Sequence, residues 1–208
     1  MSELQGCQLC PRLTAYRESI KRRFPGYHCA PVAPFGAGDA RLLIVGLAPG
    51  LHGANASGRP FTGDTSGDLL FAALHRFGFA SQARSHGHGD GMQLSDCRIT
   101  NAVKCLPPQN SPRARETQNC SRYLRDEIEA LPRGGALLAL GGLAHRAVLR
   151  ALGLRQADHP FQRLARYRFS AARHLFCCYH PSRYNLNTGR VSAEFFDAVF
   201  SDIRRTLR

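Results

Sequence analysis

The chain has 208 residues, 43% of them hydrophobic, a length that suits one substantial core and predicts a single domain over residues 1–208. Lys and Arg total 28 against 15 Asp and Glu, so the formal charge of +13 predicts a polyanionic partner. The sequence contains no apolar run long enough to span a membrane and no basic-then-apolar leader at its start, which excludes a membrane protein and leads us to expect a cytoplasmic one.

Apolar runs bounded by Gly or Pro alternate along the chain with segments whose apolar residues recur every three or four positions. Buried strands are predicted at 41–47, 97–103, 136–140 and 174–179. Helices are predicted at 65–77, 111–131, 143–152 and 192–207. This alternation indicates an α/β protein whose parallel sheet is covered by helices on both faces.

Three local patterns refine this prediction. Ser111 and Pro112 indicate an N-cap followed by proline at the first helical position, and Gly141-Gly142 indicates a tight turn from strand to helix. The segment 86–91 (HGHGDG) resembles a metal-binding tract, but alternating glycines cannot hold ligands rigidly. We therefore expect a flexible surface loop there.

Two pairs of cysteines have the spacing of metal ligands. Cys7 and Cys10 lie on one short turn, while Cys105 and Cys120 flank a proline-rich loop. Four thiolates suit either structural zinc or a [4Fe–4S] cluster, and the alternative for Cys105 and Cys120 is burial as small apolar residues. The other four cysteines lack such a pattern: Cys29, Cys97, Cys177 and Cys178. Of these, Cys97, Cys177 and Cys178 lie in predicted strands and are assigned to packing.

Three motifs resemble, in order, those of the uracil-DNA glycosylase superfamily, and most closely its family 5, the type-b enzymes. They are GLAPGLHGAN…GRPFTGD over 46–64, TNAVKCLPP over 100–108 and HPS over 180–182. With both cysteine pairs, the resemblance extends from about residue 7 to 185. It implies a three-layer α/β/α fold with a central four-stranded parallel sheet, and a structural [4Fe–4S] cluster on the four cysteines.

The resemblance also implies the activity: hydrolysis of the N-glycosidic bond of a uracil flipped out of DNA, which initiates base excision repair. The first turn of the first motif, 47–50, carries no acidic or amide side chain, so the resemblance assigns the acidic role to Asp64. It further implies that His180 supports the leaving base and that Asn101 pairs with its imide edge. The alternatives are a helix N-cap for Asp64, a packed strand-end residue for His180 and a hydrogen-bonded strand end for Asn101.

Further residues of these motifs are candidates for contacting the substrate. Phe61 would stack on the base unless it belongs to the core, and Arg183 would contact or wedge into DNA unless it is a solvated loop residue. The remaining candidates are loop residues of the first motif: Gly46, Ala48, Pro49, Gly50, His52 and Asn55.

Two other functions compete with a monofunctional glycosylase. An iron–sulfur module that captures damaged bases without turnover would keep the cluster and the basic charge, but intact Asp64, Asn101 and His180 argue against it. A zinc-stabilised nucleotide enzyme would need a phosphate-binding loop, and no G-x-G-x-x-G or P-loop follows the first predicted strand. The expected partner is DNA containing uracil, hypoxanthine or other deaminated or etheno bases, and the expected state is a monomer.

Overall fold

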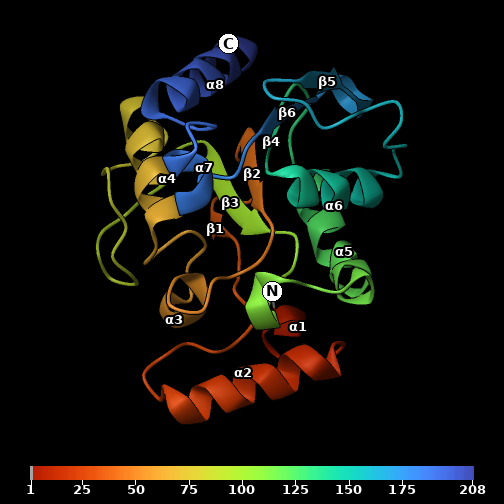
Figure 1. The fold of residues 1–208 in the computed structure, drawn as a ribbon. Helices are drawn as coiled ribbons and strands as arrows, with labels where there is room; N and C mark the ends of the chain where they lie inside the picture. The colour runs from red at the N-terminus through yellow and green to blue at the C-terminus, as the bar shows by residue number, and fades with distance from the viewer. Residues whose placement is uncertain (1) are drawn as a thin grey trace.

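A six-stranded sheet lies between two layers of helices in the computed structural model, which describes residues 2–208 (Figure 1). The strands are β1 (Phe35–Gly36), β2 (Leu42–Gly46), β3 (Cys97–Asn101), β4 (Ala136–Leu140), β5 (Arg166–Arg168) and β6 (His174–Cys178). Their order across the sheet is β1-β3-β2-β4-β6-β5. The helices are α1 (Ser2–Gln5), α2 (Pro11–Arg23), α3 (Ala54–Ser57), α4 (Thr65–Arg76), α5 (Ala114–Glu129), α6 (Gly142–Leu152), α7 (Arg183–Asn187) and α8 (Ala193–Thr206).

The α/β class is confirmed, and the strand count is the point of difference. The four predicted strands are the central ones, β3, β2, β4 and β6, and they are parallel to one another. Two antiparallel edge strands, β1 beside β3 and β5 beside β6, raise the total to six. Strands of two and three residues are too short to show a period in the sequence, which explains why they were not predicted.

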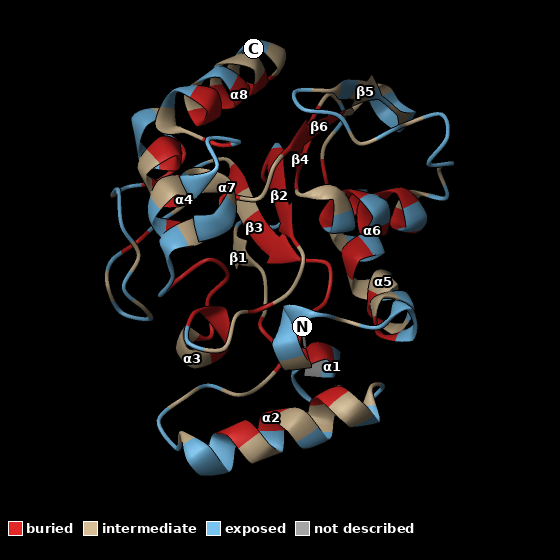
Figure 2. Cartoon of the chain, in the orientation of Figure 1, coloured by how far each residue is buried: buried red, intermediate tan, exposed pale blue. Residues whose placement is uncertain are grey.

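The two faces of the sheet divide the core. Leu42 and Ile44 of β2 pack with α4 and α8, while Leu43 and Val45 pack with α5 and α6. Successive side chains of a strand point to opposite faces, so a strand covered on both sides is apolar throughout. Figure 2 shows the consequence: β2 and β4 are buried along their length, whereas the helices are buried on their inner sides.

One predicted helix start was wrong. The helix α5 begins at Ala114, with Arg113 rather than Ser111 at its N-cap. The carboxylate of Glu116 accepts a hydrogen bond from the backbone N–H of Arg113 at 2.7 Å, and it also accepts one from Nε of Arg12 at 2.7 Å. Glu116, which lies in the first turn and forms a salt bridge with Arg12, therefore accepts the hydrogen bond of the N-cap N–H at the start of α5. The predicted glycine turn is confirmed, since Gly141 has φ +95° immediately before α6.

The helix α2 was not predicted. It begins directly after Cys10 with Pro11 in its first turn, and only Leu13, Arg17 and Ile20 are buried along its 13 residues. So narrow an apolar stripe gives little periodic signal. Figure 1 shows α2 beyond the carboxyl ends of the strands, on the side where the parallel strands deliver their following loops. Among residues 2–208, no helix is both long and apolar enough to cross a membrane.

Candidate active site

A cavity of about 350 Å³ lies where the loops that follow β2, β3 and β6 meet. Ligands of open α/β sheets bind at this carboxyl edge, because the strands deliver their loops to the same place. The cavity brings together residues up to 135 positions apart in the chain, from Leu47 to Ser182. Its lining consists of Leu47, Ala48, Gly50, Ala54, Phe61, Asp64, Ser66, Asn101, Asn110, His180 and Ser182.

Asp64 divides its carboxylate between the fold and the cavity. Oδ1 accepts a hydrogen bond from the backbone N–H of Gly67 at 3.0 Å, which makes Asp64 the N-cap of α4. Oδ2 lies beside the first-motif loop: an added Cβ would stand 3.6 Å from it at Gly50 and 2.6 Å at Gly53. The helix start favours a negative charge at this point. The N-cap therefore holds the carboxylate in place, with Oδ2 beside the loop that lines the cavity.

Asn101 and Phe61 are packed together through a glycine. Gly46 is the register partner of Asn101 across the β2–β3 pair. A Cβ on Gly46 would stand 2.5 Å from Oδ1 of Asn101 and 2.7 Å from the Phe61 ring. Gly46 is itself buried and does not line the cavity. Its contribution is the space that lets the amide and the ring approach each other at the cavity wall.

Phe61 lies in a strained turn. Its φ of +55° is uncommon for a residue with a side chain. It is 6% exposed, and its ring centroid lies 5.8 Å from that of His180. The ring therefore packs at the edge of the core and also lines the cavity, and its stacking on a base stays a prediction.

His180 is half-buried, two residues beyond the end of β6. Burial lowers the pKa of its imidazole, while the negative charge of Asp64 acts in the opposite direction. A lowered pKa keeps the ring neutral at pH 7, so it carries one N–H donor and one acceptor. The His180 carbonyl accepts a hydrogen bond from Nδ2 of Asn185 at 2.8 Å, which ties the HPS segment to α7.

Five of the candidate residues do not line the cavity. His52 is exposed, and its Nδ1 lies 2.8 Å from the Tyr27 hydroxyl. Asn55 is fully buried and donates to the Leu51 carbonyl at 3.4 Å, so it braces its own loop. Pro49 is buried beside the cavity, Gly46 acts through packing, and Arg183 is exposed at the start of α7.

Asn110 is a cavity residue that the sequence analysis missed. It follows the proline pair 107–108, and both Gln109 and Asn110 have left-handed backbone, with φ of 56° and 54°. Asn tolerates this conformation better than most residues, so its place after two prolines was an available signal for a tight turn. Only the fold shows that the turn points into the cavity. Ser66 and Ser182, near the starts of α4 and α7, were missed in the same way.

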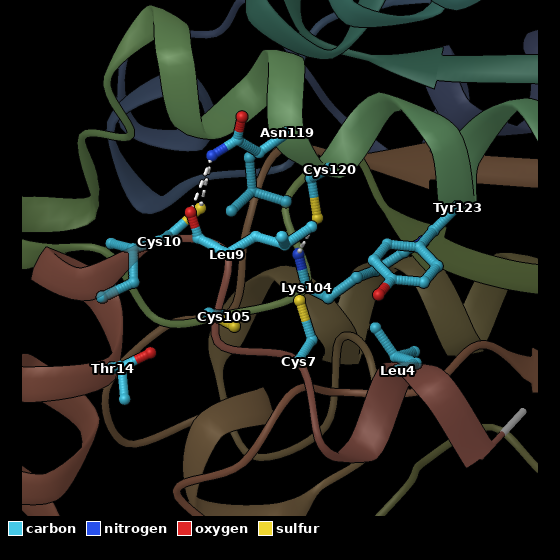
Figure 3. Close-up of a pocket in the computed structure, with 12 residues that line it drawn as sticks. Leu4, Cys7, Leu9, Cys10, Thr14, Lys104, Cys105, Asn119, Cys120 and Tyr123 are labelled. Carbon is cyan, nitrogen blue, oxygen red and sulfur yellow. Dashed lines mark hydrogen bonds between the residues drawn. The ribbon is translucent and has the colours of Figure 1, made fainter.

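All four predicted ligand cysteines line a second cavity, between the segment 4–14 and α5 (Figure 3). Cys105 and Cys120 are each 8% exposed, while Cys7 and Cys10 are half-buried. Two donors point at sulfur: the backbone N–H of Lys104 lies 3.3 Å from Sγ of Cys120, and Nδ2 of Asn119 lies 3.5 Å from Sγ of Cys10. The other three buried cysteines lie in the predicted strands, as expected: Cys97, Cys177 and Cys178.

The chemistry of this donor set suits a thiolate-bound cluster. Burial raises the pKa of Cys105 to about 12 and that of Cys120 to about 11. A bound metal centre would hold such thiols deprotonated, and N–H donors aimed at sulfur are a usual companion of iron–sulfur ligation. Within residues 2–208, no three Cys, His, Asp or Glu side chains are grouped closely enough for a single metal ion.

A buried ion pair supports the loop that carries Cys105. Lys104 is fully buried, and its Nζ donates to Thr100 Oγ1 at 2.6 Å and to the two carboxylate oxygens of Glu127 at 2.7 and 2.8 Å. Because an unpaired buried ammonium is strongly unfavourable, Glu127 of α5 and the β3 loop are held together. The same lysine thus fixes the strand end next to the first cavity and, through its backbone, contacts the second.

The fold and the first cavity define an α/β protein with an acid, an amide, an imidazole and an aromatic ring at the carboxyl edge of its parallel strands. A family model described as "Uracil DNA glycosylase superfamily" matches residues 33–204. The chain belongs to the uracil DNA glycosylase superfamily. The resemblance seen in its motifs is thereby confirmed, and the prediction of a DNA-repair glycosylase with it.

Named relatives match over most or nearly all of the chain. A type-5 uracil-DNA glycosylase of Thermus thermophilus is 44% identical over 207 residues, which cover 97% of this chain and 94% of the relative. One of Pyrobaculum aerophilum is 43% identical, covering 93% and 86%. A type-4 uracil-DNA glycosylase of Pyrobaculum aerophilum is 35% identical, covering 73% and 64%. The similarity is therefore greater to these type-5 than to this type-4 enzyme.

Proposed function

We propose that the protein hydrolyses the N-glycosidic bond of uracil flipped out of DNA, using Asp64, Asn101 and His180, and so initiates base excision repair. The observation that carries the proposal is the meeting of these three side chains and Phe61 in one cavity. Breaking this bond leaves positive charge on the sugar and negative charge on the base, so the site needs opposite stabilisers on its two sides. The carboxylate and the N–H donors supply them.

Asp64 acts on the sugar side. As the C1′–N bond breaks, its electron pair leaves with the base, and the Oδ2 side of the carboxylate stabilises the positive sugar. Water then bonds to C1′ through its oxygen, and Asp64 orients it and accepts its proton. The capping hydrogen bond from Gly67 to Oδ1 supports this role, because it fixes the direction of the other oxygen.

Asn101 and His180 act on the base side. The amide of Asn101 offers one donor and one acceptor, which match the imide edge of uracil. The neutral ring of His180 donates a hydrogen bond to a uracil oxygen as negative charge builds there. Phe61 stacks on the flipped base, an interaction worth about 1–3 kcal/mol. The 5.8 Å between the rings of Phe61 and His180 supports a site in which the base meets both.

Main-chain atoms and surface charge complete the substrate site. Ala48 and Gly50 bring the first-motif backbone to the cavity wall. Flipping a base costs a few kcal/mol of unstacking, and the net charge of +13 offsets part of this through phosphate contacts. Arg183 is the residue we assign to the DNA backbone or to the gap left by the flipped base, because it is exposed at the start of α7, three residues after His180.

Cys7, Cys10, Cys105 and Cys120 would hold a [4Fe–4S] cluster, which on binding supplies structural cross-linking and no step of the reaction. Support comes from the shared cavity, from the two N–H donors at sulfur and from membership of the superfamily. Ala48 packs against the cysteine cluster and also lines the substrate cavity, so the two sites share a wall. We further propose that the enzyme works as a monomeric single domain in the cytoplasm.

The test of the proposal is cleavage of labelled oligonucleotides that differ in one base. Duplexes carrying uracil, hypoxanthine or ethenoadenine are compared with undamaged duplex, for the wild type and for Asn101→Ala. We expect cleavage of uracil, weaker cleavage of the two purines, and a loss of uracil cleavage in the variant. An Asn101→Ala enzyme that cleaves every duplex at the wild-type rate would remove Asn101 from base recognition.

A further inference from the structure

The glycine-rich loop 85–91 is not explained by the function described so far. Its segment 86–91 was predicted to be a flexible surface loop, yet Asp90 folds back into the protein, with its side chain 9% exposed. Its carboxylate accepts backbone N–H bonds from His86, Gly87 and Met92 at 2.8, 3.2 and 3.0 Å. The loop is therefore wrapped around one carboxylate.

That carboxylate pairs with the first motif. Nη1 of Arg59 lies 2.8 Å from both oxygens of Asp90, and the Arg59 side chain is 6% exposed. The guanidinium also lies 4.5 Å from the ring centroid of Phe35 in β1. Burial alone would raise the pKa of Asp90, but the Arg59 and backbone donors outweigh it and hold this pKa well below its usual range. The pair is charged, desolvated and fixed to the edge of the sheet.

A second set of contacts ties the same loop to the same turn. Oγ of Ser85 accepts a hydrogen bond from Nη1 of Arg59 at 2.8 Å and lies 2.8 Å from Oγ1 of Thr62. Thr62 is fully buried. Arg59 lies two positions before Phe61, Thr62 follows Phe61 directly, and Asp64 lies two positions after Thr62. Hydrogen bonds with loop 85–91 thus hold the turn 59–64, which carries the cavity residues Phe61 and Asp64.

These contacts surround a residue with an uncommon backbone conformation. Phe61 has φ +55°, which is strained for a residue with a side chain, so surrounding contacts must hold this conformation in place. Ser57 contributes one, since its hydroxyl lies 3.1 Å from the Thr62 carbonyl. The only charged pair among the contacts described for this turn is Arg59–Asp90.

We propose that Arg59, Asp90 and Ser85 form a positioning clamp that sets the Phe61 ring for stacking on the flipped base. None of the three lines the cavity, so they act through Phe61 and not on the substrate. Positioning matters at this scale because a displacement of about 1 Å can cost about a hundredfold in rate. The inference rests on the stacking role proposed for Phe61.

The decisive experiment is a double-mutant cycle on single-turnover uracil cleavage with Asp90→Asn and Phe61→Ala. Asp90→Asn can keep one oxygen for the His86 and Gly87 N–H donors, but it loses the acceptor of the Met92 N–H and the charge that holds Arg59. We expect it to slow cleavage about 10- to 100-fold, while affinity for undamaged duplex stays within about twofold. In the Phe61→Ala background, the same change should cost less than about threefold, because the ring it positions is gone.

The matched control is Asp96→Asn, which removes a carboxylate paired with Arg41 at 2.6 Å at the amino end of β2, and it should leave the cleavage rate unchanged. If Asp90→Asn proves too unstable to assay, Ser85→Ala removes only the hydroxyl between Arg59 and Thr62, and about a 3- to 10-fold slower rate is expected.

Some results would contradict the clamp, and another would contradict the stacking role of Phe61. A full Asp90→Asn defect that persists in the Phe61→Ala background, or wild-type rates in both Asp90→Asn and Ser85→Ala, would overturn the clamp. A wild-type rate in Phe61→Ala alone would instead overturn the stacking role in the proposed function. Unfolding curves for every variant separate a positioning defect from a loss of folded protein.

Discussion

Asp64→Asn separates the two tasks that the structure gives to one carboxylate. The amide retains one oxygen, so the hydrogen bond from Gly67 that caps α4 can persist. Asn caps helices about as well as Asp, and the lost charge–dipole interaction is worth about 0.3–1 kcal/mol. The variant should therefore unfold within about 4 °C of the wild type, given about 2–4 °C per kcal/mol for a chain of this size.

The rate should respond far more strongly. In the Asp64→Asn variant the atom beside Gly50 and Gly53 becomes an NH₂ group, which neither stabilises a positive sugar nor accepts a proton from water. Losing a positioned acid or base costs about 10²–10⁴-fold. That is about 2.7–5.4 kcal/mol in the barrier, several times the expected change in stability.

The assay is single-turnover cleavage of a uracil duplex beside thermal unfolding and duplex binding. Asp64→Ala should add a stability loss of about 1 kcal/mol, since alanine cannot cap. Ser192→Ala is the matched control: Ser192 caps α8 by accepting from the Phe195 N–H at 3.2 Å, and it does not line the cavity. Ser192→Ala should lose about the same free energy of unfolding as Asp64→Ala, and it should cleave uracil at the wild-type rate. An Asp64→Asn enzyme within a few-fold of the wild-type rate would refute the role in catalysis.

Four further results are expected. NMR titration of His180 should give a pKa below its ordinary value, and Asp64→Asn should lower this pKa further, because the Asp64 charge opposes the effect of burial. The unfolded chain protonates this histidine at a higher pH than the folded protein does. His180 should therefore lower the free energy of unfolding as the pH falls below about 6.5. Anaerobically purified protein should hold iron and sulfide in near-equal amounts, with Cys105→Ser losing both and zinc staying well below stoichiometric; one zinc and no iron would contradict the cluster. Glu127→Gln should lower the free energy of unfolding by about 3–5 kcal/mol in urea, because it leaves Lys104 buried without its counter-charge. Affinity for duplex should fall at least about tenfold between about 50 and 200 mM salt, and a flat dependence would count against phosphate contacts.

The central architecture could be predicted because it is local and periodic. Each parallel strand is buried on both faces, so it appears as an apolar run, and its bounds shift by at most two residues in the structure. The edge strands and α2 could not be predicted in this way, because their pairing and packing partners lie elsewhere in the chain. The start of α5 is capped by Glu116, whose salt-bridge partner Arg12 lies 104 positions away.

For the site, the sequence by itself determined which residue types were present and in which motifs. The proximity of Asp64, Asn101, His180 and Phe61 was decided by the register that puts Gly46 beside Asn101 and by parallel strands ending at one edge. Only the tertiary structure excluded His52 from the cavity, brought Asn110 into it and joined Asp90 to Arg59. The physical reason is that side-chain contacts between distant loops follow from how the strands and helices pack, and packing leaves no periodic trace in a loop.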